Sequence, residues 1–267
     1  LNTTPESYEL HQAFAQMVEA GCEYAVMEVS SQGIKMHRTD GLYFNYAIFT
    51  NISPDHIGPG EHADFEEYLY YKTRLLNMCG IGLVNKDDEH APQIIKAANC
   101  ELYTYSEESK EADFVASDIR YVSQPDFVGT EFHISGKYDM EVRLGIPGLF
   151  NVVNALAAVS VCSFLGLDQA RISHALENIR VNGRMEIVYT SERCTVLVDY
   201  AHNAVSMESL LSTLRDYKPK RLVCVFGCGG NRSKDRRYSM GEIGGKMADL
   251  SIITADNSRY EKVEDII

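Results

Sequence analysis

Several features that assign proteins to broad classes are absent from this sequence of 267 residues. No run of apolar residues is long enough to span a membrane, and Leu1 does not open a signal peptide. Positive charge is scarce, since 25 Lys and Arg face 38 Asp and Glu and leave a net charge of −13. A nucleic-acid surface needs clustered cations and is therefore disfavoured. We expect a cytoplasmic protein that has neither a membrane nor a nucleic acid as partner, and that holds any anionic ligand through local groups.

Paired cysteines are also missing. The seven cysteines are odd in number and scattered, and none has the Cys-x-x-Cys spacing of a zinc site. A disulfide framework is equally disfavoured, so reduced thiols fit best. The chain has neither an initiating Met nor a GxxGKT-type phosphate loop. Because it also stops just after a strand-like run, we interpret it as a fragment of a longer protein.

What the sequence does contain is an alternation of helical and strand-like patterns. Thr4 and Pro5 predict the N-cap and first turn of a helix that ends at Gly21, and another helix is predicted over 64–76. Short apolar runs predict buried strands at 24–31, 46–53 and 80–85. This rhythm predicts an α/β protein with a mostly parallel sheet and flanking helices.

The period of the apolar pattern changes to two between about 114 and 144. This change predicts a small antiparallel appendage, with a hairpin around Gly136. Two helices follow, and the segment 181–184 then reads as a linker before strands and helices alternate again. We therefore expect a central α/β domain at 1–182 and a truncated Rossmann-like α/β domain at 183–267.

Polar side chains stand near the ends of the predicted strands. Glu28 and Ser30 close the first strand, His56 follows the second, and Asp199 and His202 follow a strand of the C-terminal domain. Parallel sheets bind ligands beyond the carboxyl ends of their strands. Each residue alone has a structural explanation, because a carboxylate can pair within a strand and a lone His is more often a hydrogen-bonding group. Their joint occurrence favours a site.

Lys72 falls on the apolar stripe of the helix predicted over 64–76. The ordinary explanation is snorkelling, in which the stem lies on apolar surface and the ammonium reaches water. Glu28 and His56 alone would make a poor Mg²⁺ site, because such a site needs another anionic oxygen donor. A carbamate, formed by Lys72 and CO₂, would supply two hard oxygens, and burial favours the neutral amine that this reaction needs. We therefore predict Glu28, His56 and Lys72 as metal ligands.

At these residues the sequence resembles the Mur ligases, the ATP-dependent amino-acid-adding enzymes of peptidoglycan synthesis, and most of all their MurE branch. The resemblance runs from residue 2 to about 261. It is carried by the ordered motifs NTTPES, MEVSSQGIKMHR, FTNISPDH, YLYYK, VNKDDEH, GLFNVVNALAA, NGRME, VDYAHN, VFGCGGNR and TADNSRYE. One motif would be weak, but their order and spacing make the resemblance specific.

The resemblance implies roles for individual residues. The positions that hold a UDP-MurNAc-dipeptide substrate are matched by Thr3, Thr4, Ser30 and Arg38. The segment near the adenine of ATP is matched by Asn151 and Asn154, and the C-terminal groups that close on ATP are matched by Arg184, Asp199 and His202. The carbamylated lysine of the family is matched by Lys72, and its Mg²⁺ ligands by Glu28 and His56. The segment that recognises the added amino acid, with an arginine for the distal carboxylate of meso-diaminopimelate, is matched by Asp256, Asn257 and Arg259.

The implied reaction is the activation of a carboxylate. ATP would phosphorylate the terminal carboxylate of UDP-MurNAc-L-Ala-D-Glu, and the amine of the added amino acid would then displace phosphate. The resemblance thus implies ATP and Mg²⁺ as cofactors, and we expect a monomer that is inactive without a phosphate loop. Two alternatives stay open: another ligase of the superfamily, of the folylpolyglutamate or cyanophycin synthetase type, and a non-catalytic module that binds a nucleotide sugar and its peptide.

Overall fold

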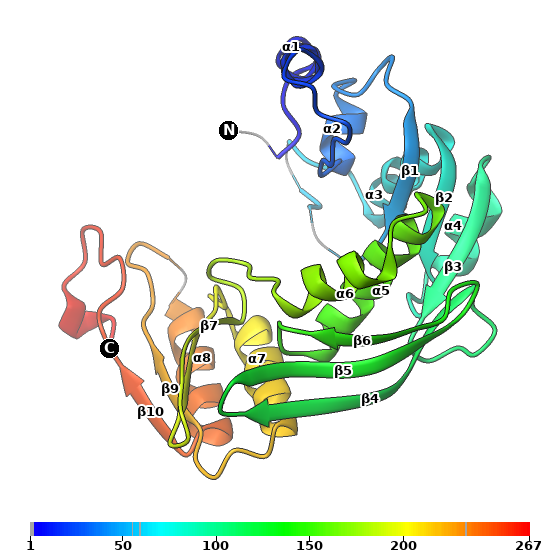
Figure 1. Cartoon of the computed structure of the whole chain (residues 1–267). Coiled ribbons are helices and arrows are strands. Elements are labelled where there is room, and N and C mark those ends of the chain that lie inside the picture. Colours follow the sequence, from blue (N-terminus) through cyan, green and yellow to red (C-terminus); the bar gives the residue numbers. More distant parts are fainter. Residues whose placement is uncertain (1–2, 55, 59, 233) are drawn as a thin grey trace. The chain divides into compact units, whose positions relative to one another are not determined.

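The computed structural model describes residues 3–54, 56–58, 60–232 and 234–267 (Figure 1). The chain divides into two compact units, which are described separately. The first unit comprises Leu1–Ser117, Ile134–Asp139 and Leu156–Leu167, and the second comprises Asp118–His133, Met140–Ala155 and Asp168–Ile267.

The first unit is built on a parallel sheet. Strands β1 (Phe44–Phe49), β2 (Cys79–Asn85) and β3 (Glu101–Ser106) are parallel neighbours in this order, and β3 pairs in parallel with the start of β4 (Phe114–Gln124). The helices are α1 (Ser7–Glu19), α2 (Ser31–Lys35), α3 (Phe65–Arg74) and α4 (Ala91–Ala97), with a 3-10 turn at Leu75–Asn77. Parallel neighbours need crossover connections, and α3 and α4 lie in the two that join β1 to β2 and β2 to β3.

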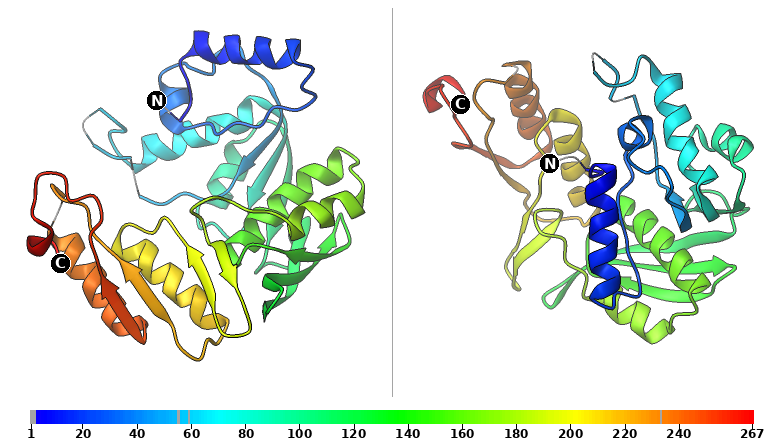
Figure 2. Two further views of the ribbon diagram at one scale, coloured as in Figure 1. Left: turned by 60° about the vertical axis from the view of Figure 1, so that its left-hand side comes forward. Right: turned by 90° about the horizontal axis from the view of Figure 1, so that it is seen from above.

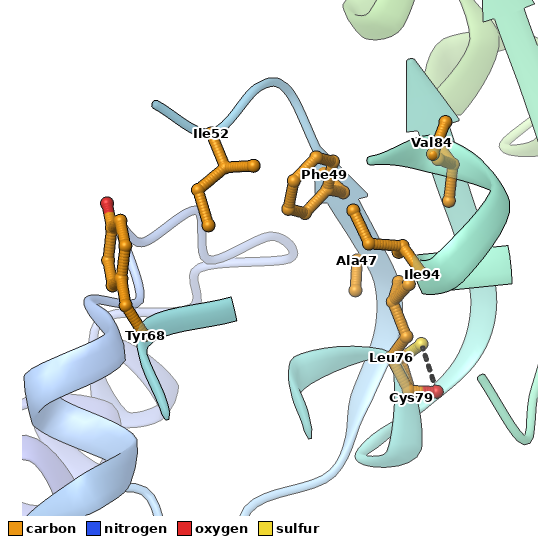
Figure 3. Packing of buried hydrophobic residues seen from close by; sticks show 9 residues of the cluster. Ala47, Phe49, Ile52, Tyr68, Leu76, Cys79, Val84 and Ile94 are labelled. Atoms are coloured by element: carbon orange, nitrogen blue, oxygen red, sulfur yellow. Dashed lines mark hydrogen bonds between the residues drawn. The ribbon is translucent and has the colours of Figure 1, made fainter. Parts of the chain in front are cut away.

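The core of the first unit lies along β1 and β2. Strand β2 is nearly all apolar or glycine, and Leu83 and Val84 are fully buried, as is typical of a parallel strand covered on both faces. Figure 3 shows Phe49, Leu76 and Ile94 pointing toward one another in this core. Tyr68 belongs to the same cluster, so the apolar stripe predicted for α3 does anchor this helix.

Strands β4, β5 (Phe127–Gly136) and β6 (Met140–Leu144) complete a sheet of order β1-β2-β3-β4-β5-β6. Two residues join β4 to β5 and three join β5 to β6, so these neighbours form antiparallel hairpins. The antiparallel strands predicted between 114 and 144 are therefore present. Helices α5 (Leu149–Phe164) and α6 (Gln169–Glu177) follow, and the Asp168 carboxylate caps α6 by accepting the Arg171 N–H.

The remainder of the second unit alternates strands and helices. It contains β7 (Glu186–Thr190), β8 (Thr195–Val198), α7 (Ala204–Asp216), β9 (Val223–Phe226), α8 (Lys234–Met247), β10 (Leu250–Ile253) and a 3-10 turn at Val263–Asp265. Strands β9 and β10 are parallel, and α7 and α8 lie on the same side of them (Figure 2). The sequence predicts β8 as part of this alternating unit, but β8 pairs with β7 in a separate antiparallel sheet.

The predicted α/β class with a mostly parallel sheet is confirmed, but two local predictions are wrong. Residues 24–30 do not form the predicted buried strand: they have no regular secondary structure, pair with no strand of the described chain, and leave Val26 98% exposed. The N-cap predicted at Thr4 is also wrong, because α1 begins after Glu6 and the Thr4 hydroxyl donates instead to Glu28 O. None of the helices in the described ranges is long and apolar enough to cross a membrane.

Candidate functional site

Lys72 of helix α3 and His56, which precedes the helix, both lie near the ring of Tyr68. The carboxylate of Asp64 caps the helix by accepting the Glu67 N–H at 2.8 Å. Lys72 is half-buried on the apolar stripe, and its Nζ lies 5.3 Å from the centre of the Tyr68 ring. The His56 ring lies 5.9 Å from that of Tyr68, between centroids. Two of the three predicted metal ligands are therefore neighbours of one buried tyrosine.

Glu28, the third predicted metal ligand, is exposed and lies in the irregular segment before α2. Its backbone oxygen accepts the Thr4 hydroxyl at 3.1 Å. Within the described ranges, no group of three or more His, Cys, Asp and Glu side chains could hold a metal ion. The described part of the chain thus holds no metal site made of these side chains alone.

Three of the residues predicted to hold the UDP-linked substrate contact one another. The fully buried Thr4 hydroxyl accepts the Ser30 N–H at 2.9 Å and lies 3.1 Å from Ser30 Oγ. Arg38 reaches Thr4 O through Nη1 at 3.4 Å and pairs with a Glu6 carboxylate oxygen through Nη2 at 2.8 Å. Thr3, beside them in the chain, is exposed. The structure therefore brings Thr4 to Ser30 and Arg38, which stand before and after the short helix α2.

His62, a buried histidine that the sequence reasoning missed, holds Ser31, the residue after Ser30. His62 has no exposed surface, and a 2.9 Å hydrogen bond joins its Nε2 to Ser31 Oγ in the first turn of α2. Burial, helped by the charge of Lys35, lowers the pKa of His62 below its ordinary 6.5. The only sequence signal for this residue was its place two positions before the Asp64 cap.

In the second unit, Asn151 and Asn154 lie in the first turns of α5. The Asn151 side chain donates through Nδ2 to Pro147 O at 2.6 Å, and Asn154 is exposed. The N–H of Gly148, just before the helix, donates to the Tyr217 hydroxyl at 3.2 Å. These two asparagines are thus presented by a turn whose backbone is held by side chains.

Asp199 organises the loops that carry Arg184 and His202. Its two carboxylate oxygens accept the N–H groups of Met185 at 2.9 Å and Ala201 at 2.8 Å. The Arg184 guanidinium lies 4.6 Å from the centre of the Tyr200 ring, and the His202 ring lies 5.2 Å from the same ring. The structure therefore gathers all three predicted residues, with Asp199 bound to the backbone.

The segment Asp256 to Arg259 lies against the glycine-rich loop that follows β9. Gly230 N–H donates to Asn257 O at 2.8 Å, and Arg259 N–H donates to the Asn257 side chain at 3.3 Å. The Arg259 side chain is exposed and its backbone is left-handed, with φ of 50°. Nearby, Arg237 binds both carboxylate oxygens of Glu261 at 2.9 and 2.8 Å, a pair that sequence reasoning missed.

Comparisons with known proteins agree along the whole chain. Residues 1–162 match the Mur ligase middle domain, and residues 183–267 match the Mur ligase glutamate ligase domain. A UDP-N-acetylmuramoyl-L-alanyl-D-glutamate--2,6-diaminopimelate ligase of Clostridium acetobutylicum is 40% identical over 99% of this chain and 54% of its own length. The ligase of the same name from Clostridium perfringens is 38% identical over 100% of this chain and 55% of its own length.

A solved structure of a ligase with this name has the same fold. It is 30% identical, with a TM-score of 0.78 over 99% of this chain and 54% of that one. The chain thus spans about half the length of the curated relatives it matches.

Proposed function

The chain belongs to the Mur ligase family, and we propose that it works in an ATP-dependent ligase that joins meso-diaminopimelate to UDP-MurNAc-L-Ala-D-Glu. The proposal is supported by the similarity to 2,6-diaminopimelate ligases along the whole chain. The dipeptide carboxylate would become an acyl phosphate, which the amine of the amino acid attacks with release of phosphate. We place the enzyme in the cytoplasm, where ATP and UDP-linked precursors occur, and expect it to act as a monomer.

The observation that carries the proposal is the position of Lys72. Its Nζ lies 5.3 Å from the centre of the Tyr68 ring, which also contacts His56. This distance suits an ammonium, which is attracted to the face of a tyrosine ring. Carbamylation would replace the ammonium, which the ring attracts, with two anionic oxygens. The proposal therefore requires that CO₂ compete with a cation–π contact.

The donor set decides whether Mg²⁺ fits. With Lys72 as an ammonium, the three predicted ligands would offer one carboxylate, one imidazole and a repelling cation, which does not suit a hard divalent ion. With Lys72 as a carbamate, Glu28 and Lys72 supply the hard oxygens and His56 a nitrogen, which does. When bound, Mg²⁺ would neutralise charge on the phosphoryl oxygens. The residues of the chain would hold and orient it.

The remaining assignments follow the contacts around each residue. Thr4, Ser30 and Arg38 would hold the UDP-linked substrate at the place where the segment before α1 meets α2. Arg184, with Asn151 and Asn154, would bind ATP. Asp199 and His202 would order the loop between Arg184 and α7. The exposed Arg259, with Asp256 and Asn257, would bind the distal carboxylate of diaminopimelate as a charge-assisted pair.

The proposal is tested on the full-length protein, phosphate loop included, by measuring ADP release with UDP-MurNAc-L-Ala-D-Glu and either meso-diaminopimelate or L-lysine. We expect release that depends on diaminopimelate and not on lysine. Release with lysine alone would reject the specificity, and binding of the UDP-linked substrate without any release would favour a non-catalytic module. Arg259→Ala should weaken use of diaminopimelate far more than binding of ATP, with Arg259→Lys as the matched variant that keeps the charge.

Lys72 has its own test. Lys72→Ala should abolish ligation but keep substrate binding, and Lys72→Arg, which retains the charge but cannot form the carbamate, should be equally inactive. A short carboxylic acid should restore part of the activity of the alanine variant. Carbon NMR with labelled bicarbonate should give a carbamate signal in the wild type that is lost in Lys72→Arg. An active arginine variant would refute the carbamate.

A further inference from the structure

One hydroxyl connects the end of α7 to the turn that presents Asn151. Tyr217, the residue after α7, lies in the segment that matches the C-terminal family model, and Gly148 lies in the segment that matches the middle-domain model. The two residues are 69 positions apart and belong to the same compact unit. The Gly148 N–H donates to the Tyr217 hydroxyl at 3.2 Å, so a side chain of one family segment holds the backbone of the other.

The Tyr217 side chain contacts several groups besides Gly148. The fully buried Thr130 hydroxyl on β5 lies 3.1 Å from that of Tyr217, and the Tyr217 ring packs on Tyr121 of β4 with 5.1 Å between centroids. A buried hydroxyl is costly unless it finds a partner, and Tyr217 supplies it. The contact is therefore a formed interaction of the fold and not an exposed side chain that happens to lie near.

Glycine is the only residue type that suits position 148. Its φ of 107° is strained for any L side chain, and a Cβ there would lie 2.8 Å from the Phe150 ring and 3.2 Å from Thr213 Cγ2 of α7. The absence of a side chain lets α7 come close to the backbone. The same glycine lies directly before α5, and its carbonyl accepts the Asn151 N–H at 3.0 Å.

The position of Asn151 depends on this turn in two ways. Its backbone N–H bonds to Gly148 O, and its side chain donates to Pro147 O at 2.6 Å. With Nδ2 engaged, the side-chain oxygen is left as an acceptor with a fixed direction. A shift of Pro147 and Gly148 would therefore turn that acceptor away, although nothing that touches a ligand had been changed.

We propose that Tyr217 is a positioning residue for nucleotide binding, which acts by holding the Gly148 N–H and so fixing the turn that presents Asn151. The inference rests on the proposed function, in which Asn151 binds ATP. The affinity for ATP would then depend on the position of the end of α7. Tyr217 itself does not touch the nucleotide.

The test compares three variants of the full protein in the ADP-release assay. Tyr217→Phe removes the hydroxyl but keeps the ring on Tyr121. We expect the KM for ATP to rise about fivefold, as the loss of one neutral hydrogen bond predicts, with kcat and the KM for the UDP-linked substrate within about twofold. Thr130→Val removes the bond to Thr130 but leaves that to Gly148, so its KM for ATP should stay near wild type. Tyr189→Phe, at an exposed tyrosine of β7, controls for the chemical change.

The outcomes separate positioning from general support of the fold. A merely structural role would lower the melting temperature of Tyr217→Phe and Thr130→Val alike and would not single out ATP. The inference is overturned if Tyr217→Phe leaves the KM for ATP unchanged in an active enzyme, or if Thr130→Val raises it equally. If the wild type forms no product, the proposed function fails, and the inference fails with it.

Discussion

Asp88 offers a sharp test of how the loop that leads to His56 is held. It lies between β2 and α4, and its side chain is 5% exposed. One carboxylate oxygen accepts the Ile52 N–H at 2.8 Å and the other accepts the His90 N–H at 2.9 Å. Ile52 is buried just after β1, so this carboxylate links the end of β1 to the loop that follows β2. Its removal leaves two backbone donors without acceptors.

The size of the effect follows from these two bonds. A hydrogen bond to a charged group contributes about 1.5 to 3 kcal/mol, and a buried donor left unpaired costs about 1 to 3 kcal/mol. Allowing for water at the His90 end, Asp88→Ala should lower the free energy of unfolding by about 3 kcal/mol. Asp88→Asn keeps one acceptor but turns an amide donor toward the other N–H, so we expect a loss of about 2 kcal/mol.

The measurement is urea unfolding followed by far-ultraviolet circular dichroism. With a slope near about 2 kcal/mol per molar, Asp88→Ala should lower the urea midpoint of the first unit by about 1.5 M. Glu89→Ala is the matched control, because the neighbouring side chain is 84% exposed and should change stability by less than about 0.5 kcal/mol. If the alanine variants at 88 and 89 had equal midpoints, the carboxylate would not hold the loop and the argument would be refuted.

Three further predictions concern other parts of the chain. The pKa of His62 is lower in the folded chain than in the unfolded chain, so the unfolded chain binds more protons just below pH 6.5. The free energy of unfolding should therefore fall as the pH drops through 6.5, by at most about 1.4 kcal/mol per pH unit. A plot of the urea midpoint against pH should be flatter for His62→Asn than for the wild type. Gly230→Ala, whose Cβ would lie 1.9 Å from Ser258 O, should lower the melting temperature markedly, whereas Gly241→Ala, with open space around it inside α8, should raise it slightly. Burial raises the pKa of Cys79 to about 12, so mass spectrometry should find it unmodified by iodoacetamide at pH 8 while the exposed cysteines react.

The elements that local pattern could predict are those whose stability is decided by neighbours in sequence. Helix α3 was predictable because Asp64 caps it and its apolar stripe has the helical period. The strand predicted at 24–31 fails for the opposite reason, since a strand also needs a neighbour whose backbone groups face its own. The apolar pattern there is real, but its N–H and C=O groups pair with no strand of the described chain.

The site residues show the same limit in finer detail. The resemblance named Thr4, Ser30 and Lys72, and the structure supplies contacts for each of them. The residues that hold them in place were missed, because His62 meets Ser31 across 31 positions of sequence and no periodicity reports such a contact. Resemblance gives the groups that act on a substrate, whereas the partners that orient those groups become visible only when distant segments are brought together.

The loops of the first unit that carry the predicted ligands are held by side chains more than by the sheet. Thr4 fastens the segment of Glu28, and Asp88 fastens the chain that leads to His56. His62 fastens the start of α2. All three contacts lie outside the strands, while the buried residues of β2 form the core of the unit. Substitutions of Thr4, Asp88 or His62 should therefore displace the predicted ligands before the sheet unfolds. When such variants are heated, ligation activity should be lost at a lower temperature than secondary structure.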